Sequence, residues 1–227
     1  IKNLGLVNAD IRGSVAGGLC GRNSGTISQC YTTGTATGWE YAGGLCGRNT
    51  GSISDCYSAV AIYGIFYVGG LTGYLDGNLT QVYSIGHVNG SNYAGGLAGY
   101  KTSKGTVTGG FWDTENSGQT TSAGGTGKTT AEMKTLATFT SAAWDFAAIW
   151  AICEGTNYPR LQWQIPVGDF SCPDGVNVED LDYFVGRWLL ENCTVDNNYC
   201  DGADTDSSGE VVLADWAILA AHWLEGI

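Results

Sequence analysis

Apolar residues in the first half of the chain recur at a fixed interval of twenty-six positions. Four related phrases, A-G-G-L-C-G twice, V-G-G-L-T-G and A-G-G-L-A-G, begin at Ala16, Ala42, Val68 and Ala94. Three further columns keep the same interval: Ile27, Ile53, Leu79; Tyr31, Tyr57, Tyr83; and Tyr41, Tyr67, Tyr93. A constant repeat of this length is typical of a solenoid.

Each repeat predicts short β-strands separated by turns. The repeats are rich in Gly, Thr, Ser, Tyr, Val and Ile and show no helical spacing of apolar residues. We expect glycines such as Gly25, Gly51 and Gly77 to form the corners, where a positive φ is needed. Stacked repeats pair at roughly 4.8 Å and bury one continuous core. Residues 1–110 are therefore predicted to form a parallel β-solenoid in which each repeat is one rung, and the chain is predicted to be mostly β.

The two ends of the repeat array differ from its middle. Phe111 follows Tyr83 by two positions more than the repeat, which predicts a two-residue insertion between Thr102 and Gly105. Ile1 lies one full repeat before Ile27, so we expect the chain to begin inside a rung with an unpaired strand edge. Another copy could cover this edge head to tail and so build a filament. The alternative is that an upstream segment covers it.

Residues 111–165 are predicted to cap the solenoid. Thr129 and Glu132 have the spacing of a capping box, which predicts a short helix ending near Phe139. Many aromatic residues follow, beginning with Trp144, and could cover the open end of the core. The phrase G-G-T-G-K-T-T at Gly124 lacks the spacing of a phosphate-binding loop, so nucleotide binding is not expected.

Charge separates the end of the chain from the rest. The formal net charge is −12, which disfavours nucleic acid and anionic membranes as partners. From Ile165 onward, thirteen acidic residues face a single base, Arg187. This shift predicts a third region at residues 166–227. No run of eighteen apolar residues is present, so membrane insertion is not expected.

The acidic region is an internal duplication with a period of thirty-five positions, and its second copy contains a candidate calcium loop. The twelve residues from Asp204 read D-T-D-S-S-G-E-V-V-L-A-D. Oxygen ligands at positions 1, 3, 5, 7 and 12 suit Ca²⁺. They would come from Asp204, Asp206, Ser208, the Glu210 carbonyl and Asp215. The alternative is a solvated acidic turn that caps a helix.

The first copy has a degenerate version of the same loop. Asp169, Ser171, Asn177 and Asp180 supply oxygens at positions 1, 3, 9 and 12. Pro173 occupies position 5, and the glycine has moved to position 7. A second Ca²⁺ site or a metal-free turn would fit this sequence, with Asp174 as a substitute ligand.

Two resemblances follow from these motifs. The G-G-L-x-G and I-S-x-C-Y phrases resemble GLUG-motif repeats, which implies a large bacterial surface or secreted protein. The paired Asp-rich loops, each followed by an amphipathic helix, resemble a type I dockerin, an EF-hand-like α-helical module that binds Ca²⁺ and docks onto a cohesin. Its recognition positions correspond to Val178, Glu179, Leu213 and Ala214, where cellulosomal dockerins commonly have a hydroxyl pair. A cohesin-like partner, the chain's own solenoid or a neighbouring copy are therefore all candidate docking partners.

Eight cysteines suggest an oxidising compartment. Cys193 and Cys200 flank a short linker and are predicted to form a disulfide, and Cys153 and Cys172 could form another. Cys20 shares a column with Cys46, as Cys30 does with Cys56, and either stacked thiols or disulfides would fit these columns. Together with the acidity and the repeats, the cysteines predict an extracellular protein, secreted or at the cell surface.

No catalytic motif stands out in the sequence. The acidic residues of the repeats fall in different columns, and neither G-x-S-x-G nor H-E-x-x-H is present. The tyrosine columns could bind glycans or protein, although stacked packing is the simpler interpretation. We therefore expect a non-catalytic structural or adhesive protein. The alternative is a dockerin-type module that anchors a larger extracellular enzyme or surface protein.

Overall fold

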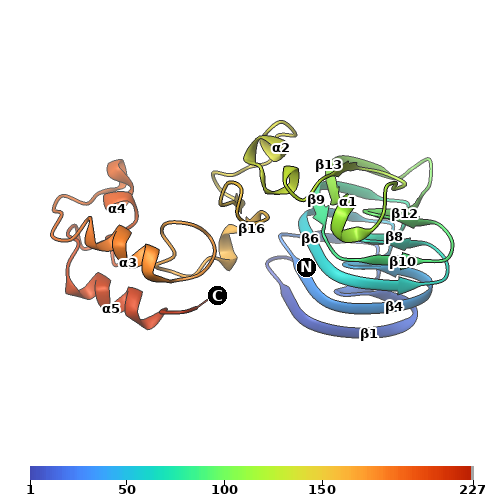
Figure 1. Cartoon of the computed structure of the whole chain (residues 1–227), viewed down its shortest axis with the longest axis horizontal. Helices are drawn as coiled ribbons and strands as arrows, with labels where there is room; N and C mark the ends of the chain where they lie inside the picture. The colour runs from blue at the N-terminus through green and yellow to red at the C-terminus, as the bar shows by residue number, and fades with distance from the viewer. Residues whose placement is uncertain (226–227) are drawn as a thin grey trace. The chain divides into compact units, whose positions relative to one another are not determined.

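The computed structural model describes residues 1–225, which divide into two compact units (Figure 1). The solenoid unit spans Ile1–Asp145, and the C-terminal unit begins at Phe146. The strands of the solenoid unit are β1 (Gly5–Gly17), β2 (Cys20–Asn23), β3 (Thr26–Ser28), β4 (Tyr31–Gly43), β5 (Cys46–Asn49), β6 (Ser52–Gly64), β7 (Val68–Gly69), β8 (Thr72–Leu75), β9 (Asn78–Ser84), β10 (Val88–Gly90), β11 (Ala94–Gly95), β12 (Ala98–Lys101), β13 (Thr106–Asp113) and β14 (Thr126–Lys128).

These strands build a parallel β-solenoid, as predicted. One sheet has the order β11-β7-β4-β6-β9-β13-β14, with β1 paired to β4, and the other has the order β12-β8-β5-β2. Tyr31 aligns with Tyr57 and Tyr57 with Tyr83, which confirms the register that the repeat predicts. Lys101 still aligns with Leu75 in this register, whereas Thr106 aligns with Asn78, two positions further back. The predicted insertion is therefore confirmed.

Two apolar clusters fill the solenoid. The larger cluster contains Ile27, Cys30, Leu45, Cys46, Ile53, Cys56, Leu71, Leu75, Leu79, Val82, Leu97 and Trp112. The smaller cluster contains Ala36, Ala42, Val60, Ile62, Val68 and Val88. The apolar columns of the repeat form these clusters because each rung places its apolar residue above the one before.

The corners of the rungs differ from the prediction. Gly25, Gly51 and Gly77 do not adopt a positive φ; one column of left-handed residues runs through Asn3, Gln29, Asp55 and Gln81, with φ between 50° and 53°. The column of Gly25, Gly51 and Gly77 has a different requirement for glycine. A Cβ on Gly51 would lie 2.1 Å from the carbonyl oxygen of Gly25, and a Cβ on Gly77 would lie 2.0 Å from that of Gly51. Close stacking of rungs, and not positive φ, therefore explains Gly51 and Gly77, whereas a Cβ on Gly25 would have no neighbour within 4 Å.

The tyrosine columns are stacked ladders. The ring centroids of Tyr57 lie 5.2 Å from Tyr31 and 4.9 Å from Tyr83, with nearly parallel planes. The Tyr41, Tyr67, Tyr93 column has the same arrangement, with spacings of 5.4 and 5.1 Å. Most ring faces are thus covered by the neighbouring ring, so these columns stabilise the stack of rungs.

Residues after β13 form the last part of the solenoid unit. Its short helices are α1 (Thr114–Ser117), η1 (Glu132–Lys134) and α2 (Leu136–Thr140). The capping box is confirmed: Thr129 N–H donates to the Glu132 carboxylate at 2.9 Å, and Glu132 N–H donates to Thr129 Oγ1 at 3.2 Å. The helix that it opens is interrupted, because Thr135 is extended between η1 and α2. Phe139 and Trp144 pack against Tyr83 and Phe111, with centroids 5.5 to 6.4 Å apart.

The division between the units falls after Asp145, inside the region that we expected to form the cap. Local contacts explain why residues from Phe146 belong to the C-terminal unit. Cys153 forms a disulfide with Cys172. The side chains of Asn157 and Arg160 donate hydrogen bonds to the carbonyl of Pro173, at 3.1 and 2.9 Å.

The regular elements of the C-terminal unit are mostly short helices. Its elements are β15 (Trp150–Ala151), β16 (Arg160–Leu161), η2 (Gln162–Gln164), α3 (Val178–Val185), η3 (Val195–Asn197), α4 (Asn198–Asp201) and α5 (Leu213–Ala221). Its buried core is Val176, Phe184, Cys193, Cys200, Ala203, Val211 and Leu219. Among residues 1–225, no helix has the length and apolar character needed to cross a membrane.

Candidate metal centre

The two halves of the C-terminal unit repeat each other in three dimensions. Val176 N–H donates to Glu225 O, and Leu224 N–H donates to Val176 O. The other half makes the equivalent pair, in which Leu189 N–H donates to Val211 O and Val211 N–H donates to Leu190 O. Each loop is thus fastened to the end of the other half's helix, so the loops and the helices α3 and α5 form one unit.

Asp215, in the first turn of α5, organises the second loop. One carboxylate oxygen accepts hydrogen bonds from Thr205 N–H at 2.7 Å, Thr205 Oγ1 at 3.1 Å and Asp206 N–H at 3.2 Å. The other oxygen accepts from Val212 N–H at 2.9 Å. Asp215 is fully buried. Its charge is therefore solvated by the loop's own donors, and this fixes where the loop begins relative to the helix.

The other two aspartates of the loop turn toward the same point. The carboxylate of Asp204 accepts from Ser208 N–H and Gly209 N–H, both at 2.9 Å, and that of Asp206 accepts from Ser208 N–H at 3.0 Å. Gly209 has a φ of 100°, a conformation that favours glycine. As a result, carboxylate oxygens of Asp204, Asp206 and Asp215 lie within 4.8 Å of one another.

The electrostatics of this cluster suit a cation. Asp204 is 3 % exposed and Asp215 is buried, while Asp206 faces solvent. In the described part of the chain, no lysine, arginine or histidine forms an ion pair with any of the three. Hydrogen bonds from Ser208 hold the pKa of Asp206 below its usual value, which favours the charged form. Three converging carboxylates without a protein cation form an oxygen-rich set of the kind that Ca²⁺ prefers.

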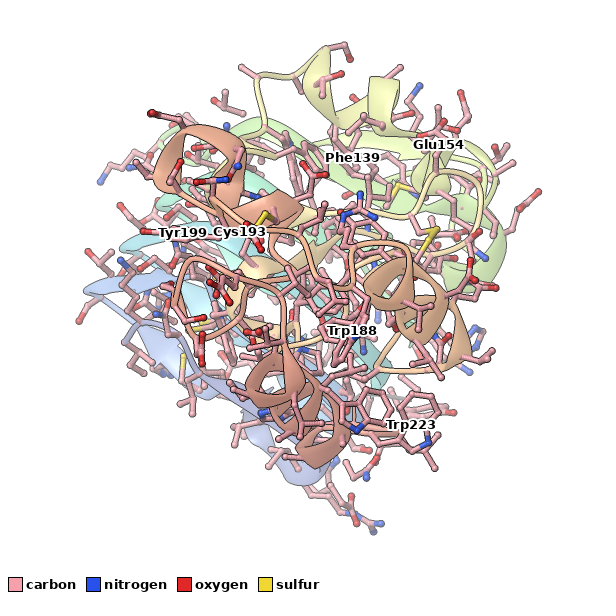
Figure 2. The ribbon with its side chains drawn as sticks, turned by 90° about the vertical axis from the view of Figure 1, so that its left-hand side faces the viewer. Phe139, Glu154, Trp188, Cys193, Tyr199 and Trp223 are labelled. Carbon is pink, nitrogen blue, oxygen red and sulfur yellow. A yellow bond between two sulfur atoms is a disulfide. The ribbon has the colours of Figure 1, made fainter. Side chains whose placement is uncertain are left out.

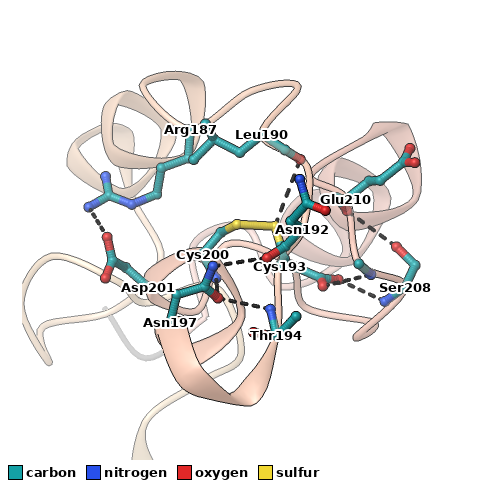
Figure 3. Close-up of a disulfide and its surroundings, with 12 residues drawn as sticks. Arg187, Leu190, Asn192, Cys193, Thr194, Asn197, Cys200, Asp201, Ser208 and Glu210 are labelled. Atoms are coloured by element: carbon teal, nitrogen blue, oxygen red, sulfur yellow. Dashed lines mark hydrogen bonds and ion pairs between the residues drawn. A yellow bond between two sulfur atoms is a disulfide. The ribbon is translucent and has the colours of Figure 1, made fainter.

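The two remaining predicted ligands of the second loop lie beside each other. Ser208 Oγ donates to the carbonyl oxygen of Glu210 at 3.2 Å (Figure 3). Both oxygens thus come from the predicted positions 5 and 7, and the Glu210 side chain itself is exposed.

The first loop has the same anchor. Asp180 is fully buried, and one of its oxygens accepts from Phe170 N–H at 2.7 Å, Ser171 N–H at 2.9 Å and Ser171 Oγ at 3.0 Å. Its other oxygen accepts from Asn177 N–H at 2.9 Å. The three bonds from backbone N–H groups match those of Asp215 one period later, which confirms the duplication at the level of single hydrogen bonds. The hydroxyl donor differs, because Ser171 lies one position after the counterpart of Thr205.

Asp169 differs from its counterpart Asp204 in one respect. Its Oδ2 accepts from Gly175 N–H at 3.0 Å, but its Oδ1 is buried without a hydrogen-bond partner. Burial raises the pKa of Asp169 to about 6. A buried carboxylate oxygen without a donor is a position that a bound cation would satisfy.

The other predicted ligands of the first loop do not converge in the same way. The amide oxygen of Asn177 accepts from Glu179 N–H at 2.8 Å, so this side chain caps α3. The Asn177 amide group donates to the Asp174 carboxylate at 3.0 Å, and the hydroxyl of Ser171 donates to the Asp180 carboxylate. Among the described residues, only the second loop brings three acidic ligands together.

A disulfide holds the connection between the two halves, as predicted (Figure 3). It joins Cys193 to Cys200. In the segment between the two cysteines, the side-chain oxygen of Asn197 accepts hydrogen bonds from Thr194 N–H and Cys200 N–H. The four residues of α4 all have φ between 51° and 58°, so this element is a left-handed turn. Left-handed turns of non-glycine residues are costly. This turn contains Cys200, one end of the disulfide, and the side chain of Asn197 caps it.

Sequence reasoning missed an apolar groove between α3 and α5. Its volume is about 510 Å³, and it is lined by Leu181, Phe184, Val185, Trp188, Leu213 and Trp216. Val185 is 59 % exposed and Leu213 is 69 % exposed. The chain continues from α3 into Trp188 and from α5 into Trp223, both of which are labelled in Figure 2. The regular spacing of apolar residues predicted two amphipathic helices, but it did not show that their apolar faces stay partly uncovered.

A second exposed apolar surface lies on the solenoid unit. This aromatic patch comprises Trp39, Tyr63, Ile65 and Phe66, which are 43 to 68 % exposed. The patch crosses two neighbouring rungs, because Phe66 N–H donates to Trp39 O and Thr37 aligns with Tyr63.

Three comparisons with known proteins bear on this chain, and the family match falls within the repeats. The model of the GLUG motif family matches residues 40–63. A candidate Gly-rich membrane protein of Evansella cellulosilytica is 45 % identical over 58 residues, which are 26 % of this chain and 7 % of that protein. The chain thus spans a small part of that relative's length. A crystal structure of a candidate immunoglobulin A1 protease from Bacteroides ovatus is 24 % identical, with a TM-score of 0.48, over 70 % of this chain and 57 % of that one. The chain therefore contains a GLUG motif within its parallel β-solenoid.

Proposed function

We propose that this protein is a non-catalytic structural or adhesive protein, secreted or displayed at the cell surface, with a calcium-stabilised, dockerin-like C-terminal unit that docks onto another copy. The observation that carries the proposal is the duplicated loop–helix unit, in which α5 contributes both to three converging carboxylates and to an uncovered apolar groove. The GLUG motif and the membrane-protein relative support a surface role.

Calcium would be held by Asp204, Asp206 and Asp215, with Ser208 and the Glu210 carbonyl beside them. Bound Ca²⁺ supplies positive charge that offsets the repulsion between the carboxylates. The residues of this chain shape the loop around the ion. Asp215 fixes the start of α5, and the positive φ of Gly209 allows the loop to reverse direction. Since α5 supplies one wall of the groove, a firmly held loop also fixes the groove.

Charge favours the solenoid unit of another copy as the docking partner. The solenoid unit carries eight acidic and eight basic residues, whereas the C-terminal unit carries fourteen acidic and two basic residues. Two C-terminal units would therefore repel each other, while a solenoid unit would not repel a C-terminal unit. The aromatic patch of the solenoid unit offers apolar surface of the kind that an apolar groove binds. Such a contact joins different surfaces of two copies, so it extends into a filament or closes into a ring.

The edge strands of the solenoid unit offer a further contact. In the described chain, β1 pairs with β4 alone and β2 with β5 alone, so each has one unpaired edge. An unpaired edge is a template for another strand. Head-to-tail addition of another copy is the second route of association through this edge, and an upstream segment of a longer protein that covers the edge would block it.

Sedimentation of the full chain over a range of concentrations, with and without Ca²⁺, tests the proposal. We expect oligomers in Ca²⁺ that dissociate with a chelator. Val185→Asp in the groove and Trp39→Ser in the patch should each reduce association at least tenfold. Val195→Asp is the control, because Val195 is 75 % exposed and lies outside the groove. A monomer under every condition would contradict self-association, and would favour the alternative that the unit anchors a larger protein to a cohesin-like partner.

A further inference from the structure

Four cysteines of the solenoid unit are unbonded in the structure and form two stacked pairs. Cys20 of β2 aligns with Cys46 of β5. Cys30 and Cys56 directly precede Tyr31 and Tyr57, which also align with each other. Both pairs therefore connect the same two rungs, at two different places in the coil.

The composition of the two columns is informative. The first column continues with Thr72 and Ala98, and the second continues with Val82. Each column thus accepts other small residues, yet each holds two cysteines, in the same two rungs. Each column therefore holds the two cysteines that one disulfide requires.

The two cysteines of each pair are neighbours in adjacent rungs. The backbone N–H of Cys30 donates to Cys56 Sγ at 3.3 Å. The neighbouring Cys56 side chain lowers the pKa of Cys30 to about 6, and that of Cys46 lowers the pKa of Cys20. Each pair therefore contains one thiol whose pKa is lowered, and the thiolate is the nucleophile in thiol–disulfide exchange. Neighbouring rungs also place Cα atoms roughly 4.8 Å apart, within the range that a disulfide spans.

We propose that Cys20–Cys46 and Cys30–Cys56 are disulfide-forming pairs that join the first two rungs covalently. The oxidant is a small-molecule disulfide. The thiolate of Cys20 or Cys30 attacks one sulfur of this disulfide and releases the other as a thiolate, leaving a mixed disulfide on the protein. The partner cysteine then loses its proton, attacks the protein sulfur and releases the second small thiol. Each bridge thus oxidises two protein thiols and reduces one small disulfide to two thiols.

The rest of the chain fits this chemistry. Cys153–Cys172 and Cys193–Cys200 are already bonded in the C-terminal unit. Conditions that form those bridges also oxidise contacting thiols elsewhere in the chain. Cys20 is part-exposed and can react in the folded protein, whereas Cys30, Cys46 and Cys56 are buried, so we expect the Cys30–Cys56 bridge to form during folding.

The test counts thiols in the full chain. The reduced, unfolded protein is refolded with oxidised glutathione and is then unfolded in iodoacetamide without reductant. Intact mass should show no alkylated cysteine, because all eight are bonded. Alkylation or glutathione adducts at the four solenoid cysteines would contradict the proposal.

Single variants then determine the connectivity, because Cys30 and Cys46 share one tryptic peptide between Arg22 and Arg48. Cys20→Thr and Cys30→Val place in each column a residue that it already holds in the third rung, so both should fold. Tandem mass spectrometry should find one alkylated thiol in each variant, at Cys46 for the first and at Cys56 for the second. A freed thiol at Cys30 in Cys20→Thr would show pairing within a rung and overturn the proposal.

Discussion

At the scale of single residues, the acidic side chains of the C-terminal unit have different roles that the sequence does not distinguish. Asp180 and Asp215 are buried and fully hydrogen-bonded within their loops. Asp204 and Asp206 turn toward Asp215, and Asp169 has an oxygen without a donor. The spacing of the loop predicted which residues are ligand candidates. It could not predict that Asn177 caps a helix, because a side-chain oxygen serves a cap and a cation equally well.

Asp215→Asn should destabilise the C-terminal unit even without Ca²⁺. The amide replaces an oxygen that accepts hydrogen bonds, and a lost bond to a buried charge costs about 2 kcal/mol. Urea unfolding in chelator, followed by tryptophan fluorescence, measures the change. Glu210→Gln is the control, since its side chain is exposed and only its carbonyl is a candidate ligand. Equal stability of the two variants would contradict the role assigned to Asp215.

Asp169 gives a pH dependence whose sign can be worked out. Burial raises its pKa to about 6, from an ordinary value of 3.8. Between these two values the folded state binds more protons than the unfolded state, so stability falls as pH rises toward 6 and stays lower above it. In chelator, the C-terminal unit should therefore melt at a lower temperature at pH 7 than at pH 5.

Asp169→Asn should reduce that difference, and the exposed Asp182→Asn should keep it. The comparison between the variants matters because general charge repulsion in an acidic protein also weakens at low pH. Identical pH profiles for wild type and Asp169→Asn would contradict the assignment.

At the scale of the elements, the rungs could be predicted because each one repeats the same choices. The columns of Ile27 and Tyr31 fixed the register and revealed the insertion before Thr106. The reason for the corner glycines was missed, since a sequence shows glycine but not the carbonyl that approaches it. The left-handed column through Asn3, Gln29, Asp55 and Gln81 was also missed, because asparagine and aspartate are enriched at positive φ but glutamine is not, so the column as a whole gives no consistent signal.

Two glycines of one column should respond differently to alanine. A Cβ on Gly51 would lie 2.1 Å from the carbonyl oxygen of Gly25, whereas a Cβ on Gly25 has no neighbour within 4 Å. Gly51→Ala should destabilise the solenoid unit by roughly 1 to 3 kcal/mol, the usual cost of forcing an extra methyl group into a packed site. Gly25→Ala should be close to neutral. Thermal unfolding followed by circular dichroism compares them, and equal melting temperatures would contradict the stacking explanation.

At the scale of the whole molecule, the sequence predicted a repetitive β region and an acidic helical region. It placed the change of organisation at residues 165 and 166, whereas the contacts divide the chain after Asp145. The difference arises from the segment around Trp150 and Leu161, which pair with each other in β15 and β16. The disulfide from Cys153 to Cys172 then links this segment to the first loop. The sequence of an aromatic-rich segment is compatible with a solenoid cap and with a helical unit. Only contacts such as this strand pair and this disulfide distinguish the two.

The assembly proposed for the molecule depends on calcium, so calcium binding is the measurement to make. Isothermal titration of the chelator-treated full chain with Ca²⁺ should show binding of at least one ion, and Asp204→Asn should remove the tight site. Binding to the folded state alone should also raise the melting temperature of the C-terminal unit as Ca²⁺ increases, by mass action. Glu210→Gln should bind as the wild type does. No heat of binding, together with a melting temperature that chelator leaves unchanged, would contradict a calcium-stabilised docking unit.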